Sequence, residues 1–292
     1  MPRPVRLPCA ALQHFFFRPF FSPVTLLPLR CLPYTVKKVF FASDFHLGAN
    51  GLLSSRERER QIVHWLDQIA PEAGAIYLVG DLFEFWFEYR TVIPKGFSRF
   101  LGKIAELRDE GLPIHIFTGN HDLWMFGYFE EEFGIPVYRE PIRIELSGKQ
   151  FFIGHGDGLG PNDRGYKIMK KVFTNPVNQL LFRWFHPDLG MRLAGFSSQA
   201  SRDAMPEEER SWLGEEREWL VQYCHRKLDQ GIEPDYFIFG HRHLVVDWQL
   251  KNGRSRYVNL GDWMSYCSYA EFDGKELNVL FFERNGTVVR NH

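Results

Sequence analysis

The chain has 292 residues, of which 45% are hydrophobic, so it can bury the core of one large domain. Its formal net charge of -1 leaves no basic excess to neutralise phosphate groups, which excludes nucleic acid as the expected partner. No apolar run reaches the roughly 18 residues of a membrane-spanning helix, so any contact with a membrane is expected to be peripheral.

The first 36 residues differ in composition from the rest of the chain. They contain seven prolines and no acidic residue. We expect residues 1–36 to be a disordered or non-native extension, with a signal or transit peptide as the alternative. Residues 37–292 are expected to form one domain, because a strand pattern begins directly after the extension.

Strand and helix patterns alternate through the first part of this domain. Short apolar runs predict strands, and apolar residues at helical spacing predict amphipathic helices. The elements expected up to residue 153 are strands at 38–43, 75–79 and 113–118, helices at 57–70, 97–110 and 128–132, and a hairpin of strands at 141–146 and 150–153. A helical insertion is expected at about 159–230, followed by strands at 235–239, 244–250, 256–260, 266–272 and 277–283.

Polar residues of types that bind metals follow several of the predicted strands, and most of them are next to a glycine. Asp44, Asp81, Asn120 and His155 are separated by intervals of 37, 39 and 35 residues, which is the length of a β-α-β repeat. Each repeat would return the chain to the same edge of the sheet. These side chains are therefore predicted to converge.

Two further pairs occur at alternating positions. Asp44 and His46 share one side if their strand continues, and the same holds for His241 and His243. A single buried histidine is more often a hydrogen-bonded core residue than a ligand, but so many imidazoles and carboxylates make little sense as an apolar core. We therefore predict two bound metal ions that share Asp81. Ligands without cysteine suit manganese, iron, zinc or magnesium, and manganese is the ion we expect.

Five motifs occur in a fixed order between about residues 38 and 283: Asp-x-His, Gly-Asp, Gly-Asn-His-Asp, Gly-His and Gly-His-x-His. In this order they resemble the calcineurin-like metallophosphoesterase superfamily. The resemblance implies an α/β fold, namely a four-layer α/β/β/α sandwich with a helical lid insertion. It also implies one ion bound by Asp44, His46, Asp81 and His243, and a second bound by Asp81, Asn120, His155 and His241.

The same resemblance implies that His121 and Asp122 are catalytic in a metal-dependent hydrolysis of a phosphoester. His121 would donate to a phosphate oxygen or assist the leaving group, and Asp122 would orient it. The alternative for Asp122 is that it caps the N-terminus of a helix.

Three stretches resemble a narrower family, the UDP-2,3-diacylglucosamine pyrophosphohydrolases, which release UMP and 2,3-diacylglucosamine 1-phosphate in lipid A biosynthesis. They are residues 80–86, the motif at His155 with the residues after it, and residues 259–263. The implied substrate is a nucleotide-linked lipid. The chain departs from this family at His121, where the best-known members carry arginine. The substrate contacts implied by the resemblance are Asn120, His121, Asp163, Tyr166 and His243.

The predicted insertion at about 159–230 mixes apolar and basic residues. Such a lid could bury acyl chains while its cations face phosphates or anionic lipid headgroups. We therefore expect a cytoplasmic enzyme that is peripheral on the inner face of the cytoplasmic membrane. Three alternatives remain: a small satellite core with a solvated basic face, a soluble phosphatase or phosphodiesterase acting on nucleotides or phosphoproteins, and a metal-free scaffold that binds a partner.

Overall fold

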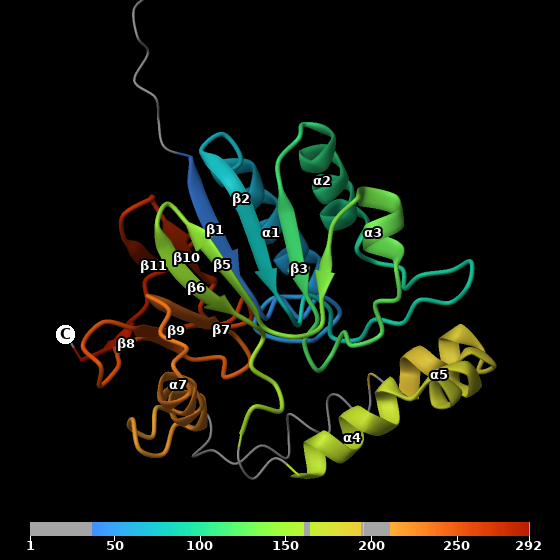
Figure 1. Ribbon diagram of the computed structural model, residues 1–292. Helices are drawn as coiled ribbons and strands as arrows, with labels where there is room; N and C mark the ends of the chain where they lie inside the picture. Colours follow the sequence, from blue (N-terminus) through green and yellow to red (C-terminus); the bar gives the residue numbers. More distant parts are fainter. Residues whose placement is uncertain (1–36, 161–163, 194, 196–210, 292) are drawn as a thin grey trace, which may run out of the picture. The chain divides into compact units, whose positions relative to one another are not determined.

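The computed structural model describes residues 37–291, apart from 161–163, 194 and 196–210 (Figure 1). The expected extension at residues 1–36 lies outside the described residues. Within the described part of the chain, the strands form two six-stranded sheets, which we call the first and the second sheet.

The first sheet contains a parallel block of four strands, and two antiparallel strands extend it beyond β1. Its strands, in spatial order, are β11 (Leu277–Phe281), β10 (Ser268–Phe272), β1 (Lys38–Ala42), β2 (Ala73–Val79), β3 (Ile114–Phe117) and β4 (Val137–Tyr138).

The second sheet is also mixed: β6, β7 and β9 are parallel, β5 is antiparallel to β6, β8 is antiparallel to β9, and β12 is parallel to β8. Its strands, in spatial order, are β12 (Val289–Arg290), β8 (Val245–Gln249), β9 (Arg256–Leu260), β7 (Tyr236–Phe239), β6 (Lys149–Ile153) and β5 (Ile142–Leu146).

Helices cover the outer face of each sheet (Figure 1). α1 (Ser55–Ile69), α2 (Ser98–Asp109) and α3 (Tyr128–Phe133) pack on the first sheet through one buried apolar cluster. α7 (Trp219–Asp229) packs on the second sheet through another cluster. A third cluster lies between the two sheets. The predicted α/β/β/α layering is confirmed.

Strand β1 shows how the sequence produces these layers. Successive side chains of a strand point to opposite faces, so a strand buried on both sides needs a continuous apolar run. Phe40 joins the cluster under the helices, whereas Phe41 faces the second sheet. The ring of Phe41 stacks on Tyr77 at 5.3 Å and on Phe151 at 5.7 Å between centroids. These stacked rings connect the two sheets.

The predicted strands and helices are confirmed to within a few residues, but one topological prediction is wrong. The interval from Asn120 to His155 is not a third β-α-β repeat. After the short strand β4, which the sequence did not predict, the chain leaves the first sheet and forms the antiparallel hairpin of β5 and β6. His155 therefore follows a strand of the second sheet.

The predicted insertion is mostly helical where it is described, but residues 211–218 form no helix. α4 (Arg164–Thr174) and α5 (Pro176–Arg183) are followed by helical residues at 187–193. The last part of the predicted range forms α7, which belongs to the outer layer of the second sheet. The function of α4 and α5 as a lid stays a prediction. No helix among the described residues is long and apolar enough to cross a bilayer.

The loop after β1 is held by a buried arginine of α1. The guanidinium of Arg58 is fully buried, and it donates to the carbonyl oxygens of Phe45 at 2.8 Å, His46 at 2.6 Å and Ala49 at 2.8 Å. A buried carbonyl without a donor costs free energy, so this one side chain satisfies an irregular stretch of backbone that water cannot reach.

Replacing this arginine should therefore destabilise the fold. We expect Arg58→Met to lower the free energy of unfolding by about 3 kcal/mol, because several carbonyl groups lose their donor at once. Urea denaturation of the metal-free protein measures this. Arg60→Met, on the exposed side of the same helix, is the matched control. Equal stability of the Arg58 and Arg60 variants would contradict the assigned role.

Candidate metal centre

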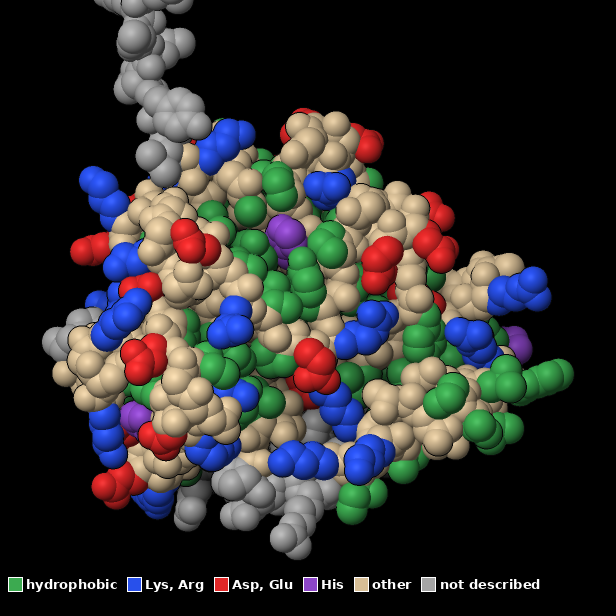
Figure 2. All heavy atoms as spheres, viewed as in Figure 1, with side chains coloured by type: hydrophobic (Ala, Val, Ile, Leu, Met, Phe, Trp, Pro, Cys, Tyr) green, Lys and Arg blue, Asp and Glu red, His purple; other side chains and the backbone are tan. Residues whose placement is uncertain are grey.

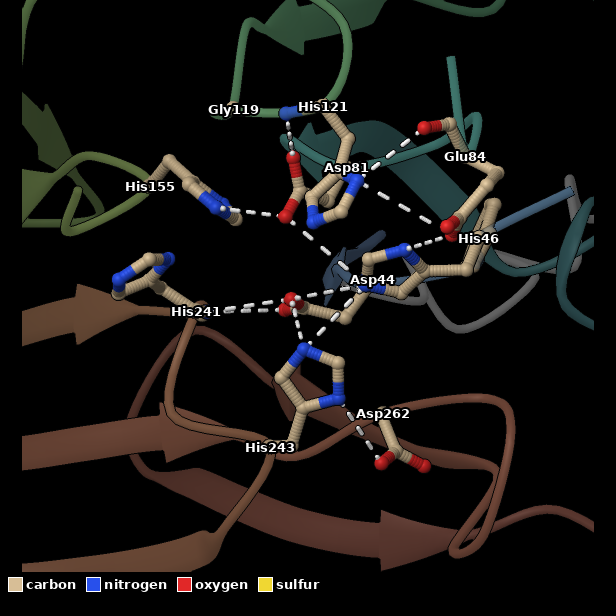
Figure 3. Close-up of polar contacts among 12 residues, drawn as sticks. Asp44, His46, Asp81, Glu84, Gly119, His121, His155, His241, His243 and Asp262 are labelled. Atoms are coloured by element: carbon tan, nitrogen blue, oxygen red, sulfur yellow. Dashed lines mark hydrogen bonds and ion pairs between the residues drawn. The ribbon is translucent and has the colours of Figure 1, made fainter. Parts of the chain in front are cut away.

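The predicted ligand residues meet at the carboxyl ends of parallel strands from both sheets. Asp44 follows β1, Asp81 follows β2 and Asn120 follows β3, while His155 and His241 follow β6 and β7 of the second sheet. In an open α/β sheet this edge is the usual place for ligands. Figure 3 shows the rings and carboxylates from the two sheets pointing toward one another.

One group of ligand atoms comes from Asp44, His46 and His243. The Nε2 atom of His243 lies 3.3 Å from Asp44 Oδ1 and 3.2 Å from Nε2 of His46. The Nε2 atom of His46 is 3.7 Å from the same oxygen of Asp44. Three ligand atoms within 4.8 Å of one another could hold a metal ion.

A second group comes from Asp81, His155 and His241. The Oδ2 atom of Asp81 lies 3.2 Å from Nε2 of His155, and it is also 3.8 Å from Nε2 of His46 in the first group. One carboxylate oxygen therefore lies between the two groups. This is the position that the sequence predicted for the shared ligand.

Asn120 lies in the chain between Gly119 and His121, which both approach Asp81 of the second group. The Oδ1 atom of Asn120 is buried and has no hydrogen-bond partner among the described residues. The Nε2 atom of His155 is likewise buried without a partner in hydrogen-bond geometry, although Asp81 is near it. Buried polar atoms are rarely left unsatisfied, so two such atoms at one place indicate that a bound group completes them.

The backbone of the ligand residues is unusual. Asp44, His46, Asp81, His241 and His243 all have positive φ angles, between 44° and 67°. Residues other than glycine rarely adopt this left-handed conformation, which costs on the order of 1–3 kcal/mol each and clusters at functional sites. The strand before Asp44 and His46 does not continue, because β1 ends at Ala42, and both side chains reach the centre from residues with positive φ angles.

Two glycines of the motifs make room for ligands that come from other motifs. A Cβ atom on Gly119 would overlap the carboxylate of Asp81, and it would lie 2.7 Å from the backbone nitrogen of Asp81. A Cβ atom on Gly80 would lie 2.5 Å from Nδ1 of His155. Glycine is needed at both positions because the two segments of the chain approach each other too closely for a side chain.

Hydrogen bonds to the far ring nitrogens orient three of the histidines. Nδ1 of His46 lies 3.1 Å from Oε2 of Glu84, and Nδ1 of His243 lies 3.2 Å from Oδ2 of Asp262. Nδ1 of His155 donates to the carbonyl oxygen of Val79 at 2.9 Å. Each bond fixes the tautomer that leaves Nε2 facing the centre as a ligand.

Sequence reasoning did not identify Glu84 and Asp262 as site residues. Both belong to stretches that it singled out, residues 80–86 and 259–263, where they were the acidic residues left without a role. The position of each carboxylate near a metal-binding motif or within a singled-out stretch was the signal that could have identified it as a partner of a ligand histidine.

His121 and Asp122 have different environments. The backbone N–H of His121 donates to Asp81 Oδ1 at 2.9 Å, and its Nδ1 lies 3.1 Å from the carbonyl oxygen of Glu84. Asp122 accepts from the backbone N–H groups of Gly119 at 2.7 Å and Leu82 at 2.8 Å, so it ties two ligand-bearing loops together.

The helix-cap alternative for Asp122 is wrong. The helix that follows, α3, begins at Tyr128 and its N-cap residue is Gly127. The orientation of His121 by Asp122 stays a prediction. Of the predicted substrate contacts, Asp163 lies outside the described residues, as does the side chain of Tyr166.

A family model decides what this arrangement is. The model described as calcineurin-like phosphoesterase matches residues 37–245, which include all the residues of both ligand groups.

The chain belongs to the calcineurin-like phosphoesterase family.

Named relatives agree with this assignment. A UDP-2,3-diacylglucosamine hydrolase from Porphyromonas gingivalis is 43% identical to this phosphoesterase over 254 residues, covering 82% of this chain and 95% of the relative. Proteins of the same name from Ectopseudomonas mendocina and Aeromonas hydrophila subsp. hydrophila are 27% and 29% identical. Those matches cover 84% and 78% of this chain, and 98% and 91% of the relatives.

This phosphoesterase is a hydrolase of phosphoesters, and its family depends on two metal ions. The residues present fit that requirement. Two groups of oxygen and imidazole side chains could each hold an ion, Asp81 of one group lies 3.8 Å from His46 of the other, and the buried Asn120 oxygen and His155 nitrogen have no hydrogen-bond partner among the described residues.

The protonation of the metal-free phosphoesterase is set by burial and by close carboxylates. Burial disfavours a charged His46, but hydrogen bonds with Asp44 and Glu84 raise its pKa to about 10. Burial also opposes charge on His155, and Asp81 nevertheless raises its pKa well above the usual value. Burial and the nearby His155 lower the pKa of His241 to about 4. Two of the ring nitrogens that face the centre therefore carry protons at neutral pH.

Metal binding should consequently release protons. His46 holds its proton up to about pH 10 in the metal-free protein, and an ion must displace that proton. We expect the affinity for divalent ions to rise by at least about tenfold per pH unit between pH 6 and 8. Calorimetry in two buffers with different ionisation enthalpies measures the number of protons released. A binding enthalpy that does not depend on the buffer would contradict this expectation.

Proposed function

We propose that this phosphoesterase cleaves the pyrophosphate of UDP-2,3-diacylglucosamine with water, to give UMP and 2,3-diacylglucosamine 1-phosphate. The observation that carries the proposal is the 43% identity to a UDP-2,3-diacylglucosamine hydrolase over 95% of that relative's length, and two groups of side chains that could hold metal ions support it. The enzyme would work at the inner face of the cytoplasmic membrane.

The proposed ligand sets follow the two groups of side chains. One ion would be held by Asp44, His46, Asp81 and His243, and the other by Asp81, Asn120, His155 and His241. The proposed ion is manganese, with which oxygen and imidazole ligands without a thiolate are compatible, as they are with iron, zinc and magnesium. When bound, two such ions lower the pKa of water and neutralise charge on the phosphate oxygens.

The residue proposed to act on the substrate is His121. Its backbone N–H holds Asp81, and its Nδ1 donates to the carbonyl oxygen of Glu84, so a proton on Nε2 requires the imidazolium form. Burial lowers the pKa of His121, and the negative charge of a bound phosphate would favour the charged ring again. The proposed role is donation from Nε2 to a phosphate oxygen or to the leaving group.

The helical insertion supports a lipid substrate. The exposed large hydrophobic side chains of the described residues are, apart from Leu52 and Val92, all at positions 168–193. α5 buries none of its residues, and Trp184 after it is 83% exposed. In Figure 2 hydrophobic side chains protrude over this part of the molecule, next to Lys and Arg. Apolar surface flanked by cations is typical of contact with acyl chains and anionic headgroups, and it disfavours a satellite core.

Product analysis tests the proposed function. We expect the enzyme supplied with manganese to convert UDP-2,3-diacylglucosamine to UMP and 2,3-diacylglucosamine 1-phosphate, both detected by mass spectrometry. Nitrophenyl phosphate and bis-nitrophenyl phosphate are the comparison substrates. Efficient turnover of these small esters without release of UMP would overturn the lipid assignment in favour of a soluble phosphatase.

Two substitutions should separate metal binding from proton donation. Asp81→Ala removes the carboxylate between the two ligand groups, so we expect loss of both ions and of nearly all activity. His121→Ala keeps the backbone N–H that holds Asp81, so we expect normal metal content and a kcat lower by about 10²–10⁴-fold. Elemental analysis by mass spectrometry reports the metal content. Equal metal loss in both variants would show that the two roles are not separate.

A further inference from the structure

A small polar cavity adjoins the second ligand group. Its volume is about 190 Å³, and the described residues around it come from three directions. His155 and Asp157 belong to the loop after β6, Tyr138 and Arg139 come from β4 and the residue after it, and Lys167 and Lys170 come from α4. Because His155 also belongs to the second ligand group, a phosphate at the metal centre would border this cavity.

We propose that this cavity is the subsite for the nucleoside monophosphate end of the substrate, an inference that rests on the proposed function. The lipid end then leaves the centre on the other side of α4. Size, charge and the geometry of α4 each support this division.

The volume of the cavity excludes the acyl chains. Pockets that enclose a drug-sized ligand measure about 300–1,000 Å³, and a water molecule takes about 30 Å³ of liquid, so this cavity has room for about six waters. That space can hold only part of the substrate. It does not suit a sugar carrying two acyl chains.

The charges around the cavity favour an anion. Arg139, Lys167 and Lys170 line it together with the carboxylates of Glu140 and Asp157, which leaves a cationic excess before any metal ion is counted. Lys and Arg in this arrangement form charge-assisted hydrogen bonds with phosphate oxygens.

Contacts with the protein hold the three cations in place. Lys170 pairs with Asp157 at 2.9 Å, Lys167 donates to the carbonyl oxygen of Gly160 at 3.0 Å, and Arg139 donates to a backbone carbonyl at 2.6 Å. An ammonium group has three N–H donors and a guanidinium five, so these bonds orient the side chains and leave donors for a ligand.

The two sides of α4 differ in chemistry. Residues of an α-helix are about 100° apart around its axis, so Lys167 and Lys170 lie on one side while Ile168 and Val172 lie roughly opposite. Ile168 is 64% exposed and Val172 is 47% exposed. The amino sugar carries the acyl chains directly and must stay near the apolar side. The nucleoside monophosphate on the other end of the P–O–P bridge would then occupy the cavity.

Equilibrium binding tests the assignment without turnover. The full chain loaded with manganese is titrated calorimetrically with UMP and, separately, with glucosamine 1-phosphate. We expect Arg139→Gln and Lys167→Gln each to weaken UMP binding about tenfold, and to leave glucosamine 1-phosphate binding unchanged. Lys171→Gln, the same change at an exposed neighbour on α4 that does not line the cavity, is the matched control and should bind UMP normally.

Several outcomes would overturn the assignment. Unchanged UMP affinity in both cavity variants would do so, as would weaker binding of glucosamine 1-phosphate with normal binding of UMP. Circular dichroism confirms that each variant is folded. If UMP binding depends on Arg139 and Lys167 but UDP-2,3-diacylglucosamine is not cleaved, the subsite stands and the proposed function fails. If UDP-2,3-diacylglucosamine is cleaved but neither Arg139→Gln nor Lys167→Gln changes the affinity for UMP, the proposed function is supported and the proposed subsite is wrong.

Discussion

The site depends on one buried carboxylate that lies between two groups of candidate ligands. Asp81 Oδ2 lies between His155 and His46, although burial opposes its charge. Neighbouring positive groups, above all His155, overcome this burial and hold the pKa of Asp81 well below its usual value. An isolated carboxylate would be costly at this depth, so the fold must surround it with cations and donors. Three features bring cations and donors close to Asp81. They are the positive φ angles of the ligand residues, the glycines at closely approaching segments, and the imidazoles oriented by hydrogen bonds.

Much of the fold and of the centre could be predicted from sequence because parallel strands fix where their ends lie. The convergence of Asp44, Asp81 and Asn120 follows from two β-α-β units, which bring successive strands to one edge. His155 arrives by a different route, through the packing of the second sheet on the first. Packing between two sheets produces no periodic pattern in the sequence. The regular spacing therefore predicted that His155 lies near Asp81, although no third β-α-β repeat brings it there.

The features that sequence reasoning missed are pairings and backbone conformations. Glu84 contacts the ring of His46, 38 residues away, and Asp262 contacts the ring of His243, 19 residues away. No local sequence pattern predicts which carboxylate contacts which imidazole. The positive φ angles of Asp44, His46 and Asp81 contradict the ordinary preference of these residue types. Tertiary contacts impose these angles, and only coordinates could reveal them.

The placement of ligands on both sheets has a consequence for biosynthesis. His46 and His243 touch across 197 positions of the chain, so the pair can form only after nearly all of the protein has left the ribosome. A nascent fragment that ends before β7 lacks His241 and His243, so neither group of ligand residues is complete in it. Divalent ions bound by both groups of ligand residues would therefore stabilise only the completed two-sheet fold, because each ion binds residues of both sheets.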